Sequence, residues 1–303
     1  GAAISRRTLR RRGPRHARVR MLLRILRRAR EMGPRTALMF ATGRFRWVRR
    51  LNRRLRGTRD HPSIVPDDND FVSLPPADGN GAGGFTLEKD AILLGLELSE
   101  DAASQLLELA ETADIYSLGQ IEPAIHGLDR INAHNAASDR PVCLATIKSP
   151  ELDALCSRIA RNPGLLGRVR DYMGGIREIN MRLEWSLVVD ADYAWRERQN
   201  QTVTYHYDVF GYNFTYAFFY LTPTDKSSGG HELIRGSHLR KPAGTYLSSI
   251  QPDHDRLVDY YGADKVAIIE GPPRSGFIED TSCFHRARPA ETAPRLALQI
   301  RYA

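Results

Sequence analysis

The pattern of hydrophobic and polar positions divides the chain into three parts. In residues 19–30, apolar side chains recur at i, i+3, i+4 and i+7 with arginines on the opposite side, and residues 37–55 gather aromatic, valine and leucine side chains in a similar way. This spacing predicts two basic amphipathic helices. Residues 57–85 are rich in Gly, Pro, Asp and Asn and show no period, which predicts a linker.

The third part mixes helical and strand patterns. It begins with a short strand pattern and a helical pattern for which Ser99 is the N-cap, and residues 150–173 predict two short helices separated by Asn162-Pro163-Gly164. From about residue 178 onward, short aromatic and β-branched runs alternate with turn residues, which predicts strands. Helices followed by many short strands indicate an α+β domain with a mainly β core, built round a sandwich or barrel.

Length and composition are those of a globular protein, and 303 residues suffice for one large domain or two modest ones. We expect a basic helical arm at residues 1–56, a linker at 57–85 and a folded domain at 86–303.

The charges are distributed unevenly along the chain. Residues 1–60 contain 21 Arg, no Lys and two acidic residues, a formal charge of +19, whereas residues 61–303 contain 23 basic and 34 acidic residues, a formal charge of −11. A basic amphipathic arm suits the surface of an anionic bilayer. Two alternatives stay open: the arm packs on the acidic body of its own or a sister chain, or it binds nucleic acid. Nucleic acid is disfavoured because such segments rarely carry a clean apolar stripe.

The three cysteines, Cys143, Cys156 and Cys283, form neither a C-x-x-C pair nor an even set, so no disulfide framework or zinc ribbon is indicated. A reducing compartment is expected. No apolar run approaches the length of a membrane-spanning helix, and no signal-peptide pattern is present. Because the sequence starts with Gly rather than Met, earlier removal of a signal peptide stays an alternative. The expected location is cytoplasmic, with peripheral contact at the inner face of a membrane. The sequence carries no indication of oligomeric state.

One run typical of a strand, "QTVTYHYDVF" (201–210), carries His206 and Asp208 two positions apart. Successive strand residues point to opposite faces, so these two side chains project from the same face and can take adjacent positions on one metal ion. A second imidazole from a distant strand, here His285, would complete a two-histidine, one-carboxylate set. Such a set is typical of non-haem Fe(II) oxygenases. The simpler alternative is a strand-end histidine beside a hydrogen-bonded carboxylate.

The residues that follow favour the metal hypothesis. A turn-rich stretch ends in Gly236-Ser237-His238, "GPPRSGFIEDTSCFH" ends at His285, and Arg295-Leu296-Ala297 begins ten residues later. Together with the His-x-Asp pair, this order resembles the phytanoyl-CoA dioxygenase-like family of Fe(II)/2-oxoglutarate-dependent oxygenases. The resemblance covers roughly residues 86–303.

The resemblance implies a double-stranded β-helix, the jelly-roll fold of the cupins, with flanking helices. It implies that His206, Asp208 and His285 are the catalytic metal ligands, and that Arg295 pairs with the distal carboxylate of 2-oxoglutarate. Fe(II), 2-oxoglutarate and O₂ are therefore the expected cofactor and co-substrates. Arginine suits its role because its planar guanidinium binds a carboxylate through two hydrogen bonds and stays charged. A second contact to 2-oxoglutarate is not evident from the sequence.

Alternation within "RLALQIRY" (295–302) places Arg295, Ala297 and Gln299 on one face, expected to line a cavity, and three aliphatic side chains on the other, expected to lie under helices. Nearby arginines are expected to face solvent or form salt bridges: Arg286, Arg288 and Arg301.

Other polar candidates have simpler interpretations. His231 and His238 lie in a Gly-containing, turn-rich stretch and do not match a His-Glu-x-x-His zinc motif, so both are expected in loops. Cys283 is expected to be a small packed side chain. The alternating aromatic residues between 214 and 220 are expected to pack in the core, with some rings lining the pocket.

The expected function is a dioxygenase that hydroxylates a small or lipid-linked substrate and releases succinate and CO₂. Halogenation is excluded by the resemblance, because related halogenases replace the carboxylate ligand that Asp208 supplies here. The alternative is a catalytically silent double-stranded β-helix that serves as a binding module, while the arm binds membrane or nucleic acid.

Overall fold

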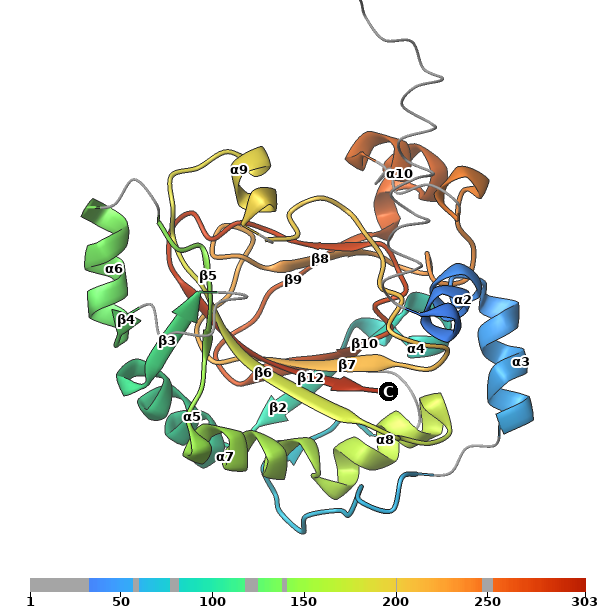
Figure 1. The fold of residues 1–303 in the computed structure, drawn as a ribbon, viewed down its shortest axis with the longest axis horizontal. Coiled ribbons are helices and arrows are strands. Elements are labelled where there is room, and N and C mark those ends of the chain that lie inside the picture. Colours follow the sequence, from blue (N-terminus) through green and yellow to red (C-terminus); the bar gives the residue numbers. More distant parts are fainter. Residues whose placement is uncertain are drawn as a thin grey trace, which may run out of the picture.

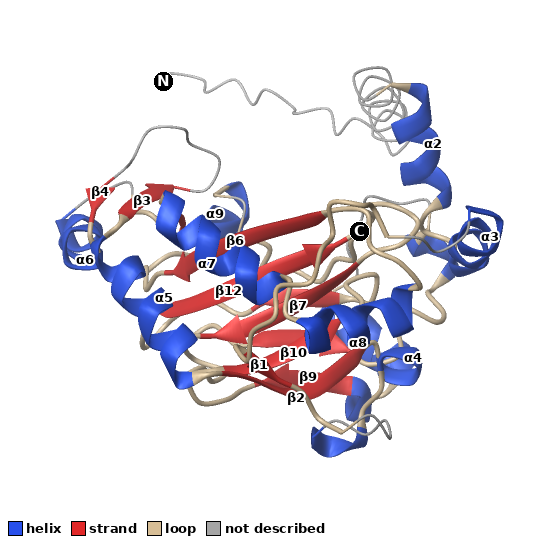
Figure 2. Cartoon of the chain, turned by 90° about the horizontal axis from the view of Figure 1, so that it is seen from below, coloured by secondary structure: helices blue, strands red, loops and turns tan. Residues whose placement is uncertain are grey.

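The computed structural model describes residues 33–56, 60–76, 82–117, 125–137, 141–199, 201–246 and 253–303. The predicted helix at 19–30 lies outside these residues. Two antiparallel sheets face each other, and helices cover the outer side of the larger one (Figure 1). Figure 2, turned by 90°, shows the long strands of the large sheet lying behind α7 and α8.

The large sheet has nine strands, all paired antiparallel. In spatial order they are β1 (Val72–Ser73), β2 (Ile92–Leu98), β10 (Ser275–Glu279), β7 (Thr215–Tyr220), β12 (Arg295–Tyr302), β6 (Ile179–Ser186), β5 (Leu144–Ile147), β3 (Asp114–Ser117) and β4 (Ile125–His126).

The small sheet has the order β11 (His285–Ala287), β8 (His231–Ile234) and β9 (Val266–Ile269). The strand predicted at 201–210 is not continuous, and that prediction is corrected to an isolated bridge between His206 and His285, with N to O distances of 3.0 and 2.8 Å. The segment borders β11 without forming a regular ladder, because strand propensity alone does not supply a partner at every position.

The order in which the chain visits the two sheets establishes the fold. From β6 onward it passes to the His206 bridge in the small sheet, back to β7, then to β8 and β9, back to β10, to β11 and finally to β12. This alternation is the jelly roll, here in its double-stranded β-helix form. The α+β prediction with a mainly β core is confirmed.

The helices are α2 (Pro34–Thr42), α3 (Arg46–Arg56), α4 (Leu87–Asp90), α5 (Glu100–Thr112), α6 (Leu128–Ala137), α7 (Pro150–Ala160), α8 (Pro163–Met173), α9 (Tyr193–Arg198) and α10 (His254–Tyr261). Short 3-10 turns occupy η1 (Ala82–Gly84), η2 (Ala243–Thr245) and η3 (Ala263–Lys265). The predicted cap is confirmed, because Ser99 Oγ accepts a hydrogen bond from Ala102 N at 3.2 Å. The predicted break is confirmed as well, and Asn162 caps α8 by accepting from Leu165 N at 3.1 Å.

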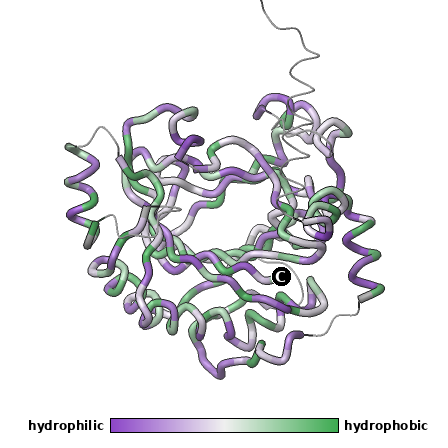
Figure 3. The backbone as a smooth tube through the Cα atoms, viewed as in Figure 1, coloured by the Kyte–Doolittle hydropathy of each residue, from purple (hydrophilic) through white to green (hydrophobic). Residues whose placement is uncertain are grey.

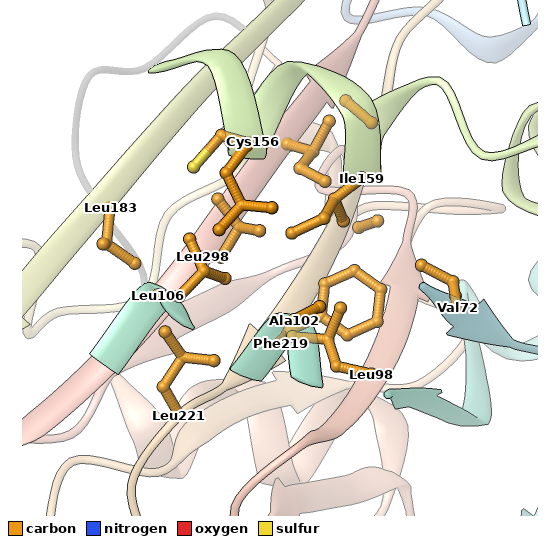
Figure 4. Packing of buried hydrophobic residues seen from close by; sticks show 14 of the residues in the cluster. Val72, Leu98, Ala102, Leu106, Cys156, Ile159, Leu183, Phe219, Leu221 and Leu298 are labelled. Atoms are coloured by element: carbon orange, nitrogen blue, oxygen red, sulfur yellow. The ribbon is translucent and has the colours of Figure 1, made fainter. Parts of the chain in front are cut away.

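The main hydrophobic core lies between the outer face of the large sheet and the covering helices. Figure 4 shows Cys156 and Ile159 of α7 packed toward Leu298 of β12 and Phe219 of β7. All four side chains are buried. Burying one face of the sheet under helices leaves the opposite face of β6, β7, β10 and β12 for the space between the sheets.

The predicted second arm helix is two helices. α2 and α3 are separated at Gly43, where an added Cβ would lie 2.8 Å from Met39 O and 3.1 Å from Gly211 O. The close approach to Gly211 of the body favours glycine at this position. The chain turns at residues 43–45, so the helical pattern of 37–55 is not one continuous helix.

The described residues of the predicted linker, 60–76 and 82–85, are largely irregular, and some of them lie on the body. His61 N donates to Ile176 O at 2.8 Å, and β1 pairs with β2. Ile64 and Phe71 are buried. The boundary between linker and domain stays a prediction.

Candidate metal and co-substrate site

A cavity of about 240 Å³ lies between the inner faces of the two sheets. Arg295, Ala297 and Gln299 of β12 line it, whereas Leu296 and Leu298 pack in the outer core. The predicted alternation of this strand is therefore confirmed. The aromatic side chains of β7 that also line the cavity are Tyr216, Phe218 and Tyr220.

His206, Asp208 and His285 come together on one wall of this cavity. His206 Nε2 lies 4.0 Å from Asp208 Oδ1, and His285 Nε2 lies 3.8 Å from Asp208 Oδ2. The two imidazole rings are 4.3 Å apart between centroids. The predicted same-face geometry of the His-x-Asp pair holds, although the residues lie beside a bridge rather than in a regular strand.

Backbone carbonyls orient both imidazoles. His206 Nδ1 lies 3.1 Å from Thr204 O, and His285 Nδ1 lies 3.1 Å from Cys283 O. A carbonyl oxygen only accepts, so each Nδ1 carries a proton, and in the neutral ring Nε2 then presents a lone pair beside Asp208. This tautomer is the one found in metal-binding histidines held by a second hydrogen bond. Burial lowers the pKa of His285 to about 3, so it stays neutral at physiological pH.

Asp208 is held between the two histidines by its own backbone. Asp208 N donates to Thr281 O at 2.8 Å, which ties it to the segment between β10 and β11. Burial raises the pKa of Asp208 above its ordinary value, and His206 opposes that rise. A desolvated carboxylate at a cavity wall is a group that a bound cation would stabilise.

Arg295 is buried at the same cavity. Its guanidinium donates to Gly229 O and, at 3.1 Å, to Ser186 Oγ. Its Nε has no hydrogen-bond partner within the part of the chain that the structure describes. A buried guanidinium with an unused donor fits the carboxylate of a co-substrate.

The neighbouring arginines are each engaged with a carboxylate, as expected. Arg286 and Arg288 lie 2.9 Å and 2.7 Å from the oxygens of Glu232. Arg301 lies 3.1 Å from Glu178. Of Arg286, Arg288, Arg295 and Arg301, the cavity lining includes only Arg295.

Comparisons with known proteins found distant similarity to solved structures only. No family model and no curated protein matches the chain. Among solved structures, the chain is similar to EctD from S. alaskensis with 2-oxoglutarate and 5-hydroxyectoine, at 16% identity over 78% of this chain and 84% of that one, with a TM-score of 0.47. The likeness is one of fold.

Two further structures are similar at comparable levels. The non-heme alpha ketoglutarate dependent epimerase SnoN from nogalamycin biosynthesis is 14% identical over 71% of this chain and 79% of that one, with a TM-score of 0.46. HygX from Streptomyces hygroscopicus with nickel, 2-oxoglutarate and hygromycin B is 14% identical over 72% and 84%, with a TM-score of 0.43. The strand order establishes the fold of this chain independently of these structures.

The sequence interpretation missed that His231 lines the cavity and that Glu279 lies behind it. His231 is not in a loop but is the first residue of β8, buried against the cavity, and this prediction is corrected. Its Nε2 lies 2.7 Å from Glu279 Oε2, and its ring stacks 5.4 Å from that of His285. Burial alone raises the pKa of Glu279, but the nearby His231 brings it below its ordinary value. The only feature of the sequence that could have indicated a strand here is the apolar pair Leu233-Ile234 after Glu232, in a segment with glycine turns on both sides.

A second donor group, Glu279, Cys283 and His285, lies behind the first. Cys283 is fully buried, and its thiol donates to Glu279 Oε1 at 3.1 Å. The cavity lining includes neither Cys283 nor Glu279. The packed role predicted for Cys283 is confirmed, and the group containing Asp208 has the access that a substrate-binding metal centre needs.

His238 lies in the turn after β8, so its predicted loop position is confirmed, and its side chain is buried. Its Nε2 lies 3.2 Å from Glu88 O, and burial lowers its pKa to about 4. It is absent from the cavity lining. His238 therefore supports packing of the segment after β8.

The end of the cavity away from Arg295 is polar. Glu184 accepts a hydrogen bond from Gln299 Nε2 at 3.2 Å and lies 3.3 Å from Arg182 Nε. Gln299 follows Arg295 by four residues in β12, a distance of about 13 Å at the usual rise of a strand. Polar side chains thus occur at both ends of the cavity, with the metal-binding candidates on the wall.

Proposed function

We propose that the chain is a non-haem Fe(II)- and 2-oxoglutarate-dependent dioxygenase of the phytanoyl-CoA dioxygenase-like family, acting on a small or lipid-linked substrate. One observation carries the proposal: two oriented imidazoles and a carboxylate meet at a cavity that also holds a buried arginine with an unused donor. Hydroxylation, with release of succinate and CO₂, is the reaction we propose.

The donor set fits a ferrous ion. His206, Asp208 and His285 would hold it through two neutral nitrogens and one oxygen, the set preferred in non-haem oxygenases. The Asp208 oxygens now lie 4.0 and 3.8 Å from the two histidine Nε2 atoms, so these donor atoms would move closer together to hold one ion. That change is within the reach of side-chain rotation.

Arg295 would bind the distal carboxylate of 2-oxoglutarate. Its contacts to Ser186 and Gly229 hold the guanidinium in place before the co-substrate arrives. Tyr220 supports it from one side, with its ring centroid 5.9 Å from the guanidinium carbon. Preorganisation of this kind limits the entropy lost on binding.

The protein groups orient the substrate and limit access of water. Tyr216, Phe218 and Phe277 form an aromatic wall, and Phe218 stacks 4.9 Å from Phe277. Arg182 and Gln299 would bind a polar group of the substrate at the other end. When bound, the ferrous ion with 2-oxoglutarate and dioxygen supplies the oxidation of a carbon–hydrogen bond.

The proposal is tested by anaerobic addition of Fe(II) and 2-oxoglutarate to the purified chain. We expect a weak visible charge-transfer band in the wild type and its loss in Arg295→Leu. Arg301→Leu, in the same strand but outside the cavity lining, is the matched control and should keep the band. Equal bands in Arg295→Leu and wild type would contradict the assignment of Arg295.

Turnover separates the enzyme from its alternative, a silent binding module. Succinate release, screened against a metabolite and lipid extract, is expected in the wild type and absent in Asp208→Ala. A product that gains one oxygen atom supports hydroxylation, whereas a product of unchanged mass supports an epimerisation. No succinate from any pool would support the silent module.

The predicted cytoplasmic location and the membrane contact of residues 1–56 stay predictions. Length and apolar character sufficient to span a bilayer are found in none of the helices that the structure describes.

A further inference from the structure

Helix α3 is attached to the body by its arginine side. Arg49 is 7% exposed, lies 3.4 Å from Asp280 and stacks 4.7 Å from the ring centroid of Phe214. Arg53 donates to Tyr172 O at 2.7 Å and to Asn213 Oδ1 at 3.0 Å. An amphipathic helix on the surface of its own protein normally buries its apolar side. In α3 the arginine side is buried instead.

The apolar side of α3 consequently faces away from the body. Trp47, Leu51 and Leu55 are 66%, 47% and 76% exposed, and their four-residue spacing places them on one side of the helix. Arg50 and Arg54 lie between them and are exposed. These five residues are the outer face of α3. Figure 3 shows hydrophilic and hydrophobic positions following one another along this helix, at the edge of the molecule.

Exposed aromatic and leucine side chains ordered on one helix side indicate a binding surface. Because arginines alternate with these apolar side chains, only certain kinds of partner can bind this surface. Residues 33–56 contain eight Arg and no acidic residue, so the partner must offer apolar depth and negative charge together. A second copy would bring the arginines of two outer faces together, which like-charge repulsion disfavours. Residues 1–32, with 12 Arg and one acidic residue, carry the same sign of charge.

We propose that the outer face of α3 inserts into the headgroup region of a bilayer that contains anionic lipids. Trp47, Leu51 and Leu55 would reach the acyl boundary, while Arg50 and Arg54 contact phosphate groups. The contacts of Arg49 and Arg53 hold the helix flat on the body with this face outward. The proposal does not depend on the reaction that the cavity performs.

Flotation of the full chain with vesicles tests the proposal. Phosphatidylcholine vesicles with phosphatidylglycerol should bind the wild type, and vesicles of phosphatidylcholine alone should bind it much less. Leu51→Ser with Leu55→Ser should weaken binding by at least about tenfold. Arg50→Gln with Arg54→Gln should weaken it by about 25-fold, because each basic residue near the surface contributes about fivefold.

The matched control is Val188→Ser with Leu239→Ser, which are 39% and 37% exposed and belong to segments outside α3. It should bind like the wild type. If the Leu51 and Leu55 double variant also binds like the wild type, the outer face is not the membrane contact and the proposal fails. This comparison holds even if other arginines bind vesicles, because all variants retain residues 1–32.

Tryptophan fluorescence gives a second measurement. Trp47 is 66% exposed whereas Trp185 is 2% exposed, so brominated lipids should quench the Trp47 signal, defined by difference from Trp47→Phe. Absence of quenching would overturn insertion. Two other results would overturn the proposal, each in a chain that does not bind vesicles. One is a dimer in light scattering that the Leu51 and Leu55 double variant abolishes. The other is binding to duplex DNA.

Discussion

Replacing Arg49 with leucine is expected to destabilise the fold, because Asp280 would lose its buried ionic partner. Asp280 is 3% exposed, and its carboxylate lies 3.4 Å from the Arg49 guanidinium. Leucine keeps the helix propensity and part of the contact with Phe214. The variant removes the charge with little change in helix propensity or side-chain volume, and it also removes the Arg49 hydrogen bonds to Tyr212 O and Ser282 Oγ.

The size of the loss in unfolding free energy depends on the hydrogen bonds that Asp280 keeps. Removing one partner of a buried ion pair costs about 3–5 kcal/mol. Asp280 keeps Tyr172 Oη as a donor at 2.6 Å and Ser282 N at 3.0 Å. Those contacts place the loss at the lower end, about 3 kcal/mol, which corresponds to a fall in Tm of about 5 °C. Arg50→Leu, one residue along the same helix but exposed, is the matched control and should change stability by less than about 0.5 kcal/mol.

The loss should depend on pH. Burial alone raises the pKa of Asp280, but Arg49, with smaller contributions from other neighbours, holds it well below its ordinary value. In the wild type this stabilisation is fully present above the unfolded pKa, near 4, and is lost as the pH falls through the folded value. Without Arg49, burial dominates and the folded pKa rises, so the penalty shrinks as Asp280 takes up a proton.

Urea unfolding at pH 7 and pH 5, followed by circular dichroism, measures both effects. We expect a larger difference between Arg49→Leu and wild type at pH 7 than at pH 5. A difference below about 1 kcal/mol at pH 7, or one equal to that of Arg50→Leu, would show that the Arg49 contact does not stabilise the fold and would refute the reasoning.

Further predictions concern the site and its support. Asp208→Ala should lower Mn(II) affinity by more than about 100-fold without changing the circular dichroism spectrum, since loss of a ligand exceeds the effect of loss of an outer contact; unchanged affinity in a Mn(II) titration would remove it from the metal site. Gly276→Ala should cost about 2 kcal/mol in urea unfolding, because its Cβ would meet Phe219 Cδ1 at 2.4 Å and Phe218 O at 2.7 Å. Leu298→Ala, at a fully buried position of the outer core, should cost about 3 kcal/mol in the same assay; a loss under about 1 kcal/mol would indicate that this core can collapse around the missing side chain.

Local features of the structure were predictable from the sequence because neighbours in the chain decide them. Ser99 caps α5, and Asn162 separates α7 from α8, as the capping residues indicated. The alternation of β12 into a cavity side and a core side follows from the two-residue period of a strand. The same period places His206 and Asp208 on one side of the chain.

The short strand β8 was missed for an equally physical reason. Its four residues lie between glycine turns and include two polar side chains, so no alternation is visible in the sequence. Contacts from elsewhere in the chain bury all four. Glu279 and His231 thereby come within 2.7 Å of each other, although 48 positions separate them in the sequence.

The sequence by itself determined the charge asymmetry, the helical and strand periods and the residue types available for metal binding, since each is a property of neighbouring residues. Only the tertiary structure decided which distant groups meet. It brings His285 beside His206, and it joins Arg49 to Asp280 across 231 positions, which turns the apolar side of α3 outward. A helical period indicates that a helix has two sides, but which side is buried depends on the surface it meets, and that surface exists only after folding.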